Sequence, residues 1–201
     1  MTTARDLFII AIDKEPSRPV GQGDLSLALA GAEVIDLLGD EAIELDGDRM
    51  VPARQPTTDD QLLGQAAASL HRQVPYERVE DWLWRRGRDL STAYLTALEE
   101  SGQLTRQRRS RLSFSADQMT LADSPARRRA MSRWASDEPV LAALAAVVGI
   151  HGEQTSDSPS PVDDAVTTVV AAVHDAVMEL EAVRQRRAIE NAAFSNIWRG
   201  A

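Results

Sequence analysis

DLSLALAGAEVIDLL, residues 24–38, is the stretch of sequence that decides the fold class. Its larger apolar residues recur every three or four positions, which places them on one face of an α-helix. That face consists of Leu25, Ala28, Leu29, Ala32, Ile35 and Leu38. Asp24 suits the N-cap of this helix, and Gly39 suits its end. Residues 42–52, with a turn at Asp46-Gly47-Asp48, then predict a small β-hairpin.

Helices also dominate the sequence on either side, and one further hairpin interrupts them. The alternating segment 103–121 follows a helix that Gly102 ends, and a helix followed by a hairpin is typical of winged-helix proteins. The other helical patterns cover residues 58–71, 75–84, 90–101, 125–135, 139–150 and a long segment that begins at Ser160-Pro161. We therefore predict a mainly α fold: a single globular helical domain over residues 1–201, with two small β-hairpins, winged-helix-like elements and a surface loop at 151–164.

The same periodic patterns predict which side chains form the core. Apolar residues that recur at helical spacing face the interior, because only one stripe of each helix packs against its neighbours. The predicted buried set is Leu29, Ile35, Leu38, Leu63, Leu95, Leu98, Leu144, Val170, Val173 and Val177.

The composition describes a folded protein without disulfide bonds. Of the 201 residues, 43% are hydrophobic and 26% are charged, which is ordinary for a globular chain. The apolar run Leu7–Ile12 is too short to cross a bilayer, and so is Val140–Val148, which with nine residues is the longest such run. Because the chain has no cysteine, we expect a cytoplasmic protein, peripheral at most on the inner face of the membrane.

Charge is distributed unevenly along the chain. The net charge is −9, yet residues 105–133 hold eight arginines, whereas residues 33–60 hold nine acids. Lys14 is the one lysine beside 21 arginines, a bias that a GC-rich, bacterial genome would produce. The negative balance makes nucleic acid an unfavourable partner, and no helix offers a clear set of base-reading side chains. The arginines can instead meet acids of the same or a neighbouring chain, or phosphate groups.

The sequence contains none of the common catalytic motifs. It lacks a Gly-rich phosphate-binding loop, an HExxH metal motif and a Gly-x-Ser-x-Gly elbow. The acid pairs Asp59-Asp60 and Asp163-Asp164 open predicted helices, where the helix dipole accounts for them without a metal. We therefore expect no enzymatic activity, no metal site and no cofactor.

The second predicted hairpin combines basic and apolar residues near its tip. Leu112 and Phe114, with Arg109 and Arg111, would let the hairpin contact an anionic membrane, because arginines bind headgroups while apolar side chains enter the leaflet. Alternatively, these residues mediate self-association into a homo-oligomer, or the two apolar side chains pack inward as part of the core.

Several stretches, taken in order, carry a resemblance to a known family. They are TARDLFIIAID (residues 3–13), DLSLALAGAEVIDLL leading into AIELDG (24–47), LTALEESGQLTRQ (95–107), RLSFSADQMTLAD (111–123) and AALAAVVGI (142–150). This succession resembles the Golgi phosphoprotein 3 family over nearly the whole chain. Its most specific part is A-G-x-x-[VIL]-[IL]-[DE]-L followed by a hairpin, which matches residues 30–37.

The resemblance implies a non-enzymatic peripheral adaptor that binds phosphatidylinositol 4-phosphate. The family's headgroup site uses a tryptophan and an arginine around the second helix, and an Arg-x-x-Arg pair before the hairpin. The matching positions here are Gly21, Ala30, Arg88 and Ser91, so Arg88 alone keeps the family's residue type. Arg85 lies three residues earlier, on the same face if the helix continues. We therefore predict Arg88 and Arg85 as the headgroup-binding residues.

The leading functional prediction is thus an adaptor that docks on an anionic phospholipid or phosphoinositide and presents a surface to an unidentified protein client. One alternative is a soluble helical oligomeric scaffold without lipid specificity, which would dissociate in high salt. The other is a winged-helix nucleic-acid binder, which would retard random duplex DNA at low salt.

Overall fold

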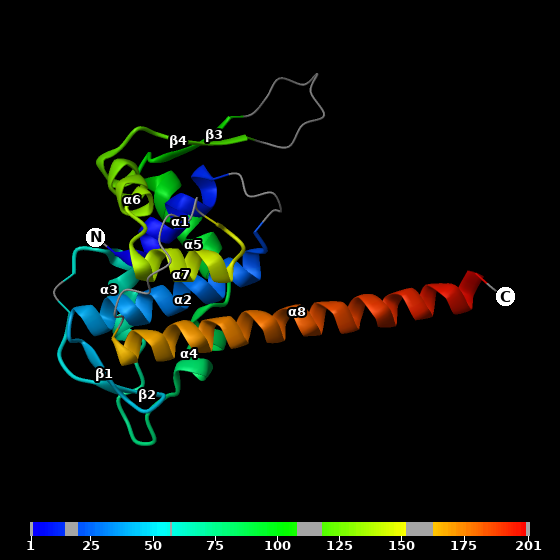
Figure 1. Ribbon diagram of the computed structural model, residues 1–201, viewed down its shortest axis with the longest axis horizontal. Coiled ribbons are helices and arrows are strands. Elements are labelled where there is room, and N and C mark those ends of the chain that lie inside the picture. Colours follow the sequence, from blue (N-terminus) through cyan, green and yellow to red (C-terminus); the bar gives the residue numbers. More distant parts are fainter. Residues whose placement is uncertain (1, 15–19, 57, 108–117, 152–162, 200–201) are drawn as a thin grey trace.

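The computed structural model describes residues 2–14, 20–56, 58–107, 118–151 and 163–199 (Figure 1). Over these ranges the chain forms eight helices and two two-stranded antiparallel sheets. The helices are α1 (Thr3–Asp13), α2 (Gln22–Gly39), α3 (Gln61–Ala68), α4 (Val79–Arg86), α5 (Leu90–Glu100), α6 (Pro125–Ala135), α7 (Pro139–Val147) and α8 (Asp164–Arg199); the strands are β1 (Ile43–Asp46), β2 (Arg49–Pro52), β3 (Leu104–Gln107) and β4 (Gln118–Leu121). The predicted mainly helical fold with two small hairpins is therefore confirmed.

Helix α2 is the element on which the others converge. Helices α1, α4, α5 and α8 all contact it, and Figure 1 shows it running through the middle of the molecule. Every residue from Leu25 to Ile35 is buried, including Ser26 and Glu33. A helix that is covered on all sides does not need a single apolar stripe. The stretch that decides the fold is therefore also the centre of the core.

The start of α2 differs from the sequence prediction. The helix begins at Gln22, and Gly21 is its N-cap, without a side-chain capping bond. Asp24 lies in the first turn instead, where its carboxylate accepts hydrogen bonds from Arg184 Nη1 of α8 at 2.7 and 2.8 Å. The predicted Asp24 cap is wrong, because a partner far along the chain binds this side chain.

Helix α8 crosses α2 closely because two glycines leave room for it. A Cβ on Gly31 would overlap Val173 Cγ2, and a Cβ on Gly23 would lie 2.8 Å from Leu180 Cδ2. Val169 and Val173 are fully buried in this contact region. The first half of α8 therefore packs along α2, and its second half extends past the other elements (Figure 1).

Both hairpins form where the sequence predicts strands. Ile43 lies opposite Pro52 in the first sheet, and Leu104 lies opposite Leu121 in the second. Gly47 closes the first turn with a φ of 62°, in the left-handed region that glycine adopts without strain. Residues 108–117, which connect β3 and β4, lie outside the described part of the chain.

Two helices start later than predicted, α3 because of a local cap and α4 because of a tertiary contact. The cap of α3 is Asp60, whose Oδ1 accepts from the amides of Leu62 and Leu63; the Thr58 hydroxyl accepts from the Asp60 amide instead of capping the helix. Helix α4 begins at Val79 and not at Pro75, because the backbone before it is bonded to the first hairpin. The amide of Met50 donates to the carbonyl of Glu77 at 2.9 Å.

The predicted core is largely confirmed. The buried members of the predicted set are Leu29, Ile35, Leu63, Leu98, Leu144 and Val173; the members that are partly buried and pack against this core are Leu38, Leu95, Val170 and Val177. The set missed α1, whose Leu7, Ile9 and Ile10 are almost completely buried. The apolar run in α1 is too short for periodicity to predict either its structure or its burial.

Candidate lipid-headgroup site

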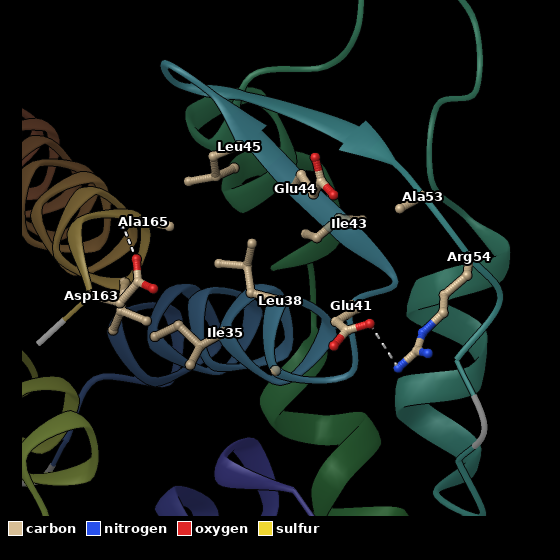
Figure 2. A pocket seen from close by; sticks show the side chains of 12 residues that line it. Ile35, Leu38, Glu41, Ile43, Glu44, Leu45, Ala53, Arg54, Asp163 and Ala165 are labelled. Carbon is tan, nitrogen blue, oxygen red and sulfur yellow. Dashed lines mark hydrogen bonds and ion pairs between the residues drawn. The ribbon is translucent and has the colours of Figure 1, made fainter.

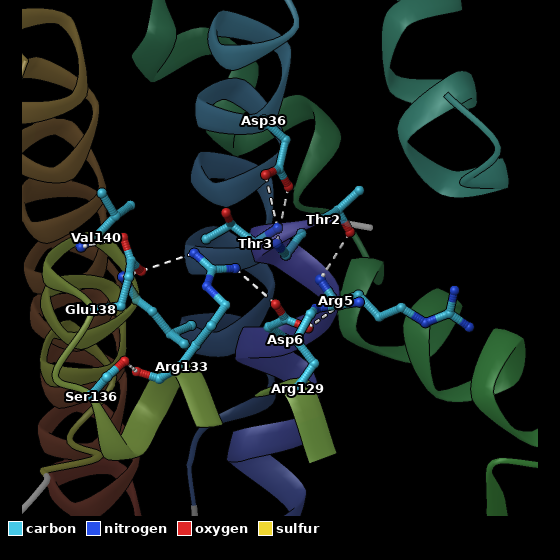
Figure 3. A network of polar contacts seen from close by, with 12 residues as sticks. Thr2, Thr3, Arg5, Asp6, Asp36, Arg129, Arg133, Ser136, Glu138 and Val140 are labelled. Carbon is cyan, nitrogen blue, oxygen red and sulfur yellow. Dashed lines mark hydrogen bonds and ion pairs between the residues drawn. The ribbon is translucent and has the colours of Figure 1, made fainter. Parts of the chain in front are cut away.

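The arginines of α6 form ion pairs within the chain and do not present a free basic face. The pairs are Arg127–Asp13, Arg128–Asp123, Arg129–Asp6, Arg133–Asp6 and Arg133–Glu138, with nitrogen–oxygen distances of 2.5 to 2.9 Å. Figure 3 shows Arg129 and Arg133 converging on Asp6 of α1, whose side chain is 1% exposed. Arg127, Arg129 and Arg133 therefore stabilise the packing of α6 on α1, and the partners of all four arginines come from outside the acidic segment 33–60.

A second internal ion pair joins α4 to α2. Arg86 binds both oxygens of Glu33, at 2.7 and 2.9 Å, and the Tyr94 hydroxyl donates to the same carboxylate at 3.2 Å. Burial raises the pKa of Glu33, and the hydrogen bond and charge of Arg86 oppose that rise. Burial also raises the pKa of Tyr94 well above its ordinary value. Arg86 is thus part of the core and not of a binding surface.

Arg85, one of the two predicted headgroup residues, is also held within the chain. Its guanidinium binds Glu77 at 2.7 and 2.8 Å, donates to the carbonyl of Ser69 at 3.2 Å, and lies 5.0 Å from the Trp82 ring centroid. The hydrogen bond to Glu77 raises the pKa of Arg85. A phosphate at this position would have to compete with a carboxylate already in place.

Arg88, the other predicted residue, lies in the turn between α4 and α5 and is exposed. Among the described residues it makes no ion pair. It lines a hollow of about 300 Å³ together with Gln22 and Ser26 of α2, Trp84 of α4 and Leu180 of α8. The structure therefore places Arg88 beside the first turn of α2, whose N-cap Gly21 provides no side-chain acceptor for the first amides. Free amides at a helix N-terminus and an arginine both favour an anion.

The remaining positions of the family's headgroup site have structural roles in this chain. Ser91 is buried; its amide donates to Ser26 Oγ at 3.0 Å and its hydroxyl bonds to the same atom at 2.9 Å, which ties α5 to α2. Ala30 is fully buried, and its carbonyl accepts from Trp82 Nε1 at 3.2 Å. A side chain at Gly21 would meet the Asp24 carboxylate. Arg88 is the one residue of the four that offers a charged group to the hollow.

Trp84 is a lining residue that the sequence prediction did not single out. It is partly buried at the hollow, whereas Trp82 is fully buried and hydrogen-bonded inside the core. Residues two positions apart point to different sides of a helix, which separates the two tryptophans. The sequence signal for a tryptophan at this site was the Trp82-x-Trp84 pair before an arginine cluster. This pattern does not show which of the two rings faces outward.

A larger hollow than the one at Arg88 lies elsewhere, beneath the first hairpin (Figure 2). It measures about 760 Å³ and is lined mainly by apolar side chains of α2 and β1, including Leu38, Ile43 and Leu45. Arg54 at its edge pairs with Glu41 at 3.4 Å. None of the predicted site residues lines this hollow, and its single arginine already has a carboxylate partner.

The four predicted hairpin residues, Arg109, Arg111, Leu112 and Phe114, lie outside the described part of the chain, so their roles stay predictions. In the part that is described, no group of histidine, aspartate or glutamate side chains is arranged to hold a metal ion. None of the helices in that part is both long enough and apolar enough to cross a membrane.

The fold and this site define a class of protein: a mainly helical domain with two hairpins and an exposed arginine at a helix start. The family model described as Golgi phosphoprotein 3 (GPP34) matches residues 4–191, so the chain belongs to this family. The family is one of non-enzymatic adaptors, known for binding phosphatidylinositol 4-phosphate at the Golgi. No individual curated protein gives a significant match. The bacterial origin suggested by the arginine bias stays a prediction.

Proposed function

We propose that this chain is a peripheral adaptor that docks on anionic or phosphorylated lipid through the hollow around Arg88 and presents another surface to a protein client. Family membership supports the general role. The observation that carries the site is the contrast between Arg88 and its neighbours: Arg85 and Arg86 each bind a carboxylate, whereas Arg88 makes no ion pair among the described residues. An exposed guanidinium beside uncapped helix amides can donate to a phosphate without first losing a partner.

The proposed site has less binding energy available than the family's full set of residues would provide. Each charge-assisted hydrogen bond contributes about 1.5–3 kcal/mol, and the chain has Gly21, Ala30 and Ser91 at the other three positions. We therefore expect weak affinity, poor discrimination among phosphoinositides and a marked decrease in binding as salt is raised.

Sedimentation with phosphatidylcholine vesicles, with and without phosphatidylinositol 4-phosphate, tests the proposal at low salt. We expect Arg88→Ala to weaken binding to the phosphoinositide vesicles about tenfold, with little change in Tm. Arg128→Ala is the matched control, because it removes the same charge from an exposed position on α6. Equal binding by Arg88→Ala and the wild type would show that this headgroup site is not used.

Arg85→Ala tests the second predicted headgroup residue in the same assay. If Arg85 exchanges Glu77 for a phosphate, its loss should weaken binding as much as the loss of Arg88. A much smaller effect would restrict the site to Arg88.

The scaffold alternative makes a different prediction for the same preparations. A protein that pellets equally with neutral and anionic vesicles, and whose oligomers dissociate in high salt, would be a scaffold without lipid specificity. Retarded random duplex DNA at low salt would instead favour the nucleic-acid alternative.

A further inference from the structure

The second half of α8 leaves the body of the molecule. The helix has 36 residues, and a helix of that length measures about 54 Å. Arg184, bound to Asp24, marks the point where α8 parts from α2. From Gln185 to Glu190 every residue is exposed, and Ile189 has 70% of its surface accessible. Figure 1 shows this half of the helix extending beyond all other elements.

Such an extension lacks the contacts that normally stabilise a helix of this kind. Most helices in proteins owe their stability to the burial of one face, and isolated helices of about 12–15 residues are marginal in water. The first half of α8 meets this condition through Val169, Val173 and Ala176, which are buried. The second half of α8 can bury one face only when another surface covers it.

Charge indicates the nature of that surface. Residues 182–199 contain four arginines and one acid, Glu190, although the whole chain has a net charge of −9. Arg186 and Arg187 are exposed, and among the described residues they form no ion pair. An anionic surface therefore attracts this segment while it repels the acidic remainder of the chain. Two such segments lying side by side would repel each other, which disfavours a second copy as the occupant.

The residue types in the segment favour lipid over an acidic protein. Arginines are combined with Ile189, Phe194, Ile197 and Trp198. Protein segments at a membrane interface contain these residue types, because aromatic and branched apolar residues suit the acyl boundary and arginines suit the headgroups.

We infer that residues 182–199 of α8 form a second membrane contact, a helix that lies on an anionic lipid surface with Arg186 and Arg187 at the headgroups. This contact extends the proposed function and does not require Arg88. The two contacts are adjacent, because Leu180 lines the Arg88 hollow and Arg184 binds the first turn of α2 beside it. One membrane surface can therefore engage both.

Vesicles of phosphatidylcholine and phosphatidylglycerol, without phosphoinositide, test the tail contact. We expect the double variant Arg186→Glu, Arg187→Glu to bind these vesicles at least about tenfold more weakly than the wild type. The control is Arg72→Glu, Arg128→Glu, which changes the net charge equally at two exposed positions of the body. Wild-type binding by the tail variant, or an equal loss in the control, would overturn the inference.

Tryptophan emission provides a second, independent measurement. We expect a blue shift when the full chain binds these vesicles, and we expect Trp198→Phe to remove most of it. A shift as large in Trp198→Phe as in the wild type would contradict the tail contact, because any shift from Trp84 at the Arg88 hollow is common to both proteins.

These assays can disprove the Arg88 site and the tail contact separately. If Arg88→Ala has no effect on phosphoinositide vesicles while the tail variant still loses phosphatidylglycerol binding, only the Arg88 site is disproved. If the tail variant changes the mass in sedimentation equilibrium and not vesicle binding, the tail binds another copy of the chain, and the membrane contact is disproved.

Discussion

Helix α6 and the second half of α8 are both rich in arginine, but they use it in different ways. In α6 each of the four arginines binds a carboxylate, because α1 and the helix flanks bring Asp6, Asp13, Asp123 and Glu138 within reach. From Gln185 to Glu190 every residue of α8 is exposed, and Arg186 and Arg187 have no carboxylate partner among the described residues. The same residue type therefore holds two helices together in one region and remains available for an external anion in the other.

The same contrast appears at short range around the end of α4. Arg86 lies against α2, with its side chain 15% exposed, and binds the fully buried Glu33. Arg88 is two residues further on and exposed, and it has no ion-pair partner in the part of the chain that the structure describes. Tertiary packing, and not local sequence, decides whether an arginine is structural or available for binding. Four measurements test this dependence on tertiary packing.

The largest effect is expected for Arg86→Ala. The change leaves the Glu33 carboxylate buried with only the Tyr94 hydroxyl bonded to it, and losing one partner of a buried pair costs about 3–5 kcal/mol. Urea unfolding measures this loss as a decrease in the free energy of unfolding. Arg88→Ala is the control and should change stability by less than about 0.5 kcal/mol. Similar losses for the two variants would remove the distinction between these arginines.

Asp36 shows what happens when a partly buried carboxylate accepts hydrogen bonds mainly from backbone amides. Its oxygens accept from the amides of Thr3 and Ala4 at 2.8 and 3.1 Å (Figure 3), and burial raises its pKa from 3.8 to about 6. Between these pH values the folded protein keeps a proton that the unfolded chain releases. The free energy of unfolding therefore falls as the pH rises from about 4 to 6, by up to about 3 kcal/mol from this group.

The raised pKa of Glu33 also makes the free energy of unfolding depend on pH. Comparison of the wild type with Asp36→Asn, which keeps Glu33, isolates the contribution of Asp36. Relative to the variant, the wild type should lose stability as the pH rises through this window. A stability difference that is the same at pH 4 and pH 7 would contradict the raised pKa.

Within the α6 region, Arg133→Ala should have an intermediate effect. It removes the bonds to Asp6 and Glu138, but Asp6 keeps Arg129 at 2.7 Å. We expect a loss of about 1–3 kcal/mol in the free energy of unfolding, since a buried acceptor loses one donor. A loss as large as that of Arg86→Ala would mean that Arg129 cannot hold Asp6 alone.

The smallest effect is expected for Arg128→Ala. Arg128 and Asp123 are both more than half exposed, and exposed ion pairs contribute about 0–1 kcal/mol. Thermal unfolding should therefore give nearly the wild-type Tm. A clear destabilisation would show that the α6 ion pairs act as one network and not as separate contacts.

Much of the fold could be predicted from the sequence because it depends on local patterns. The helical stripe of residues 24–38 and the turn at Asp46–Asp48 are read within a few positions, and both elements form as predicted. Predictions that concerned individual side chains were less reliable. Asp24 does not cap α2 because Arg184, 160 residues away in the sequence, binds it.

The candidate site could be predicted only in part, for a similar reason. The family resemblance identified Arg88 from its position in the chain. It did not show that Arg85 is bound to Glu77 or that Ser91 ties α5 to α2. Those facts depend on which distant groups each side chain meets in the folded state.

The sequence by itself therefore determined that this chain is a mainly helical member of the Golgi phosphoprotein 3 family, because hydrophobic periodicity, turn residues and motif order are local properties of the chain. Only the tertiary structure decided which of its arginines remain available. A guanidinium is neutralised when packing brings a carboxylate within hydrogen-bonding distance, and that distance is set by contacts between helices far apart in sequence. Asp6 meets Arg133 across 127 residues, whereas Arg186 and Arg187 meet solvent.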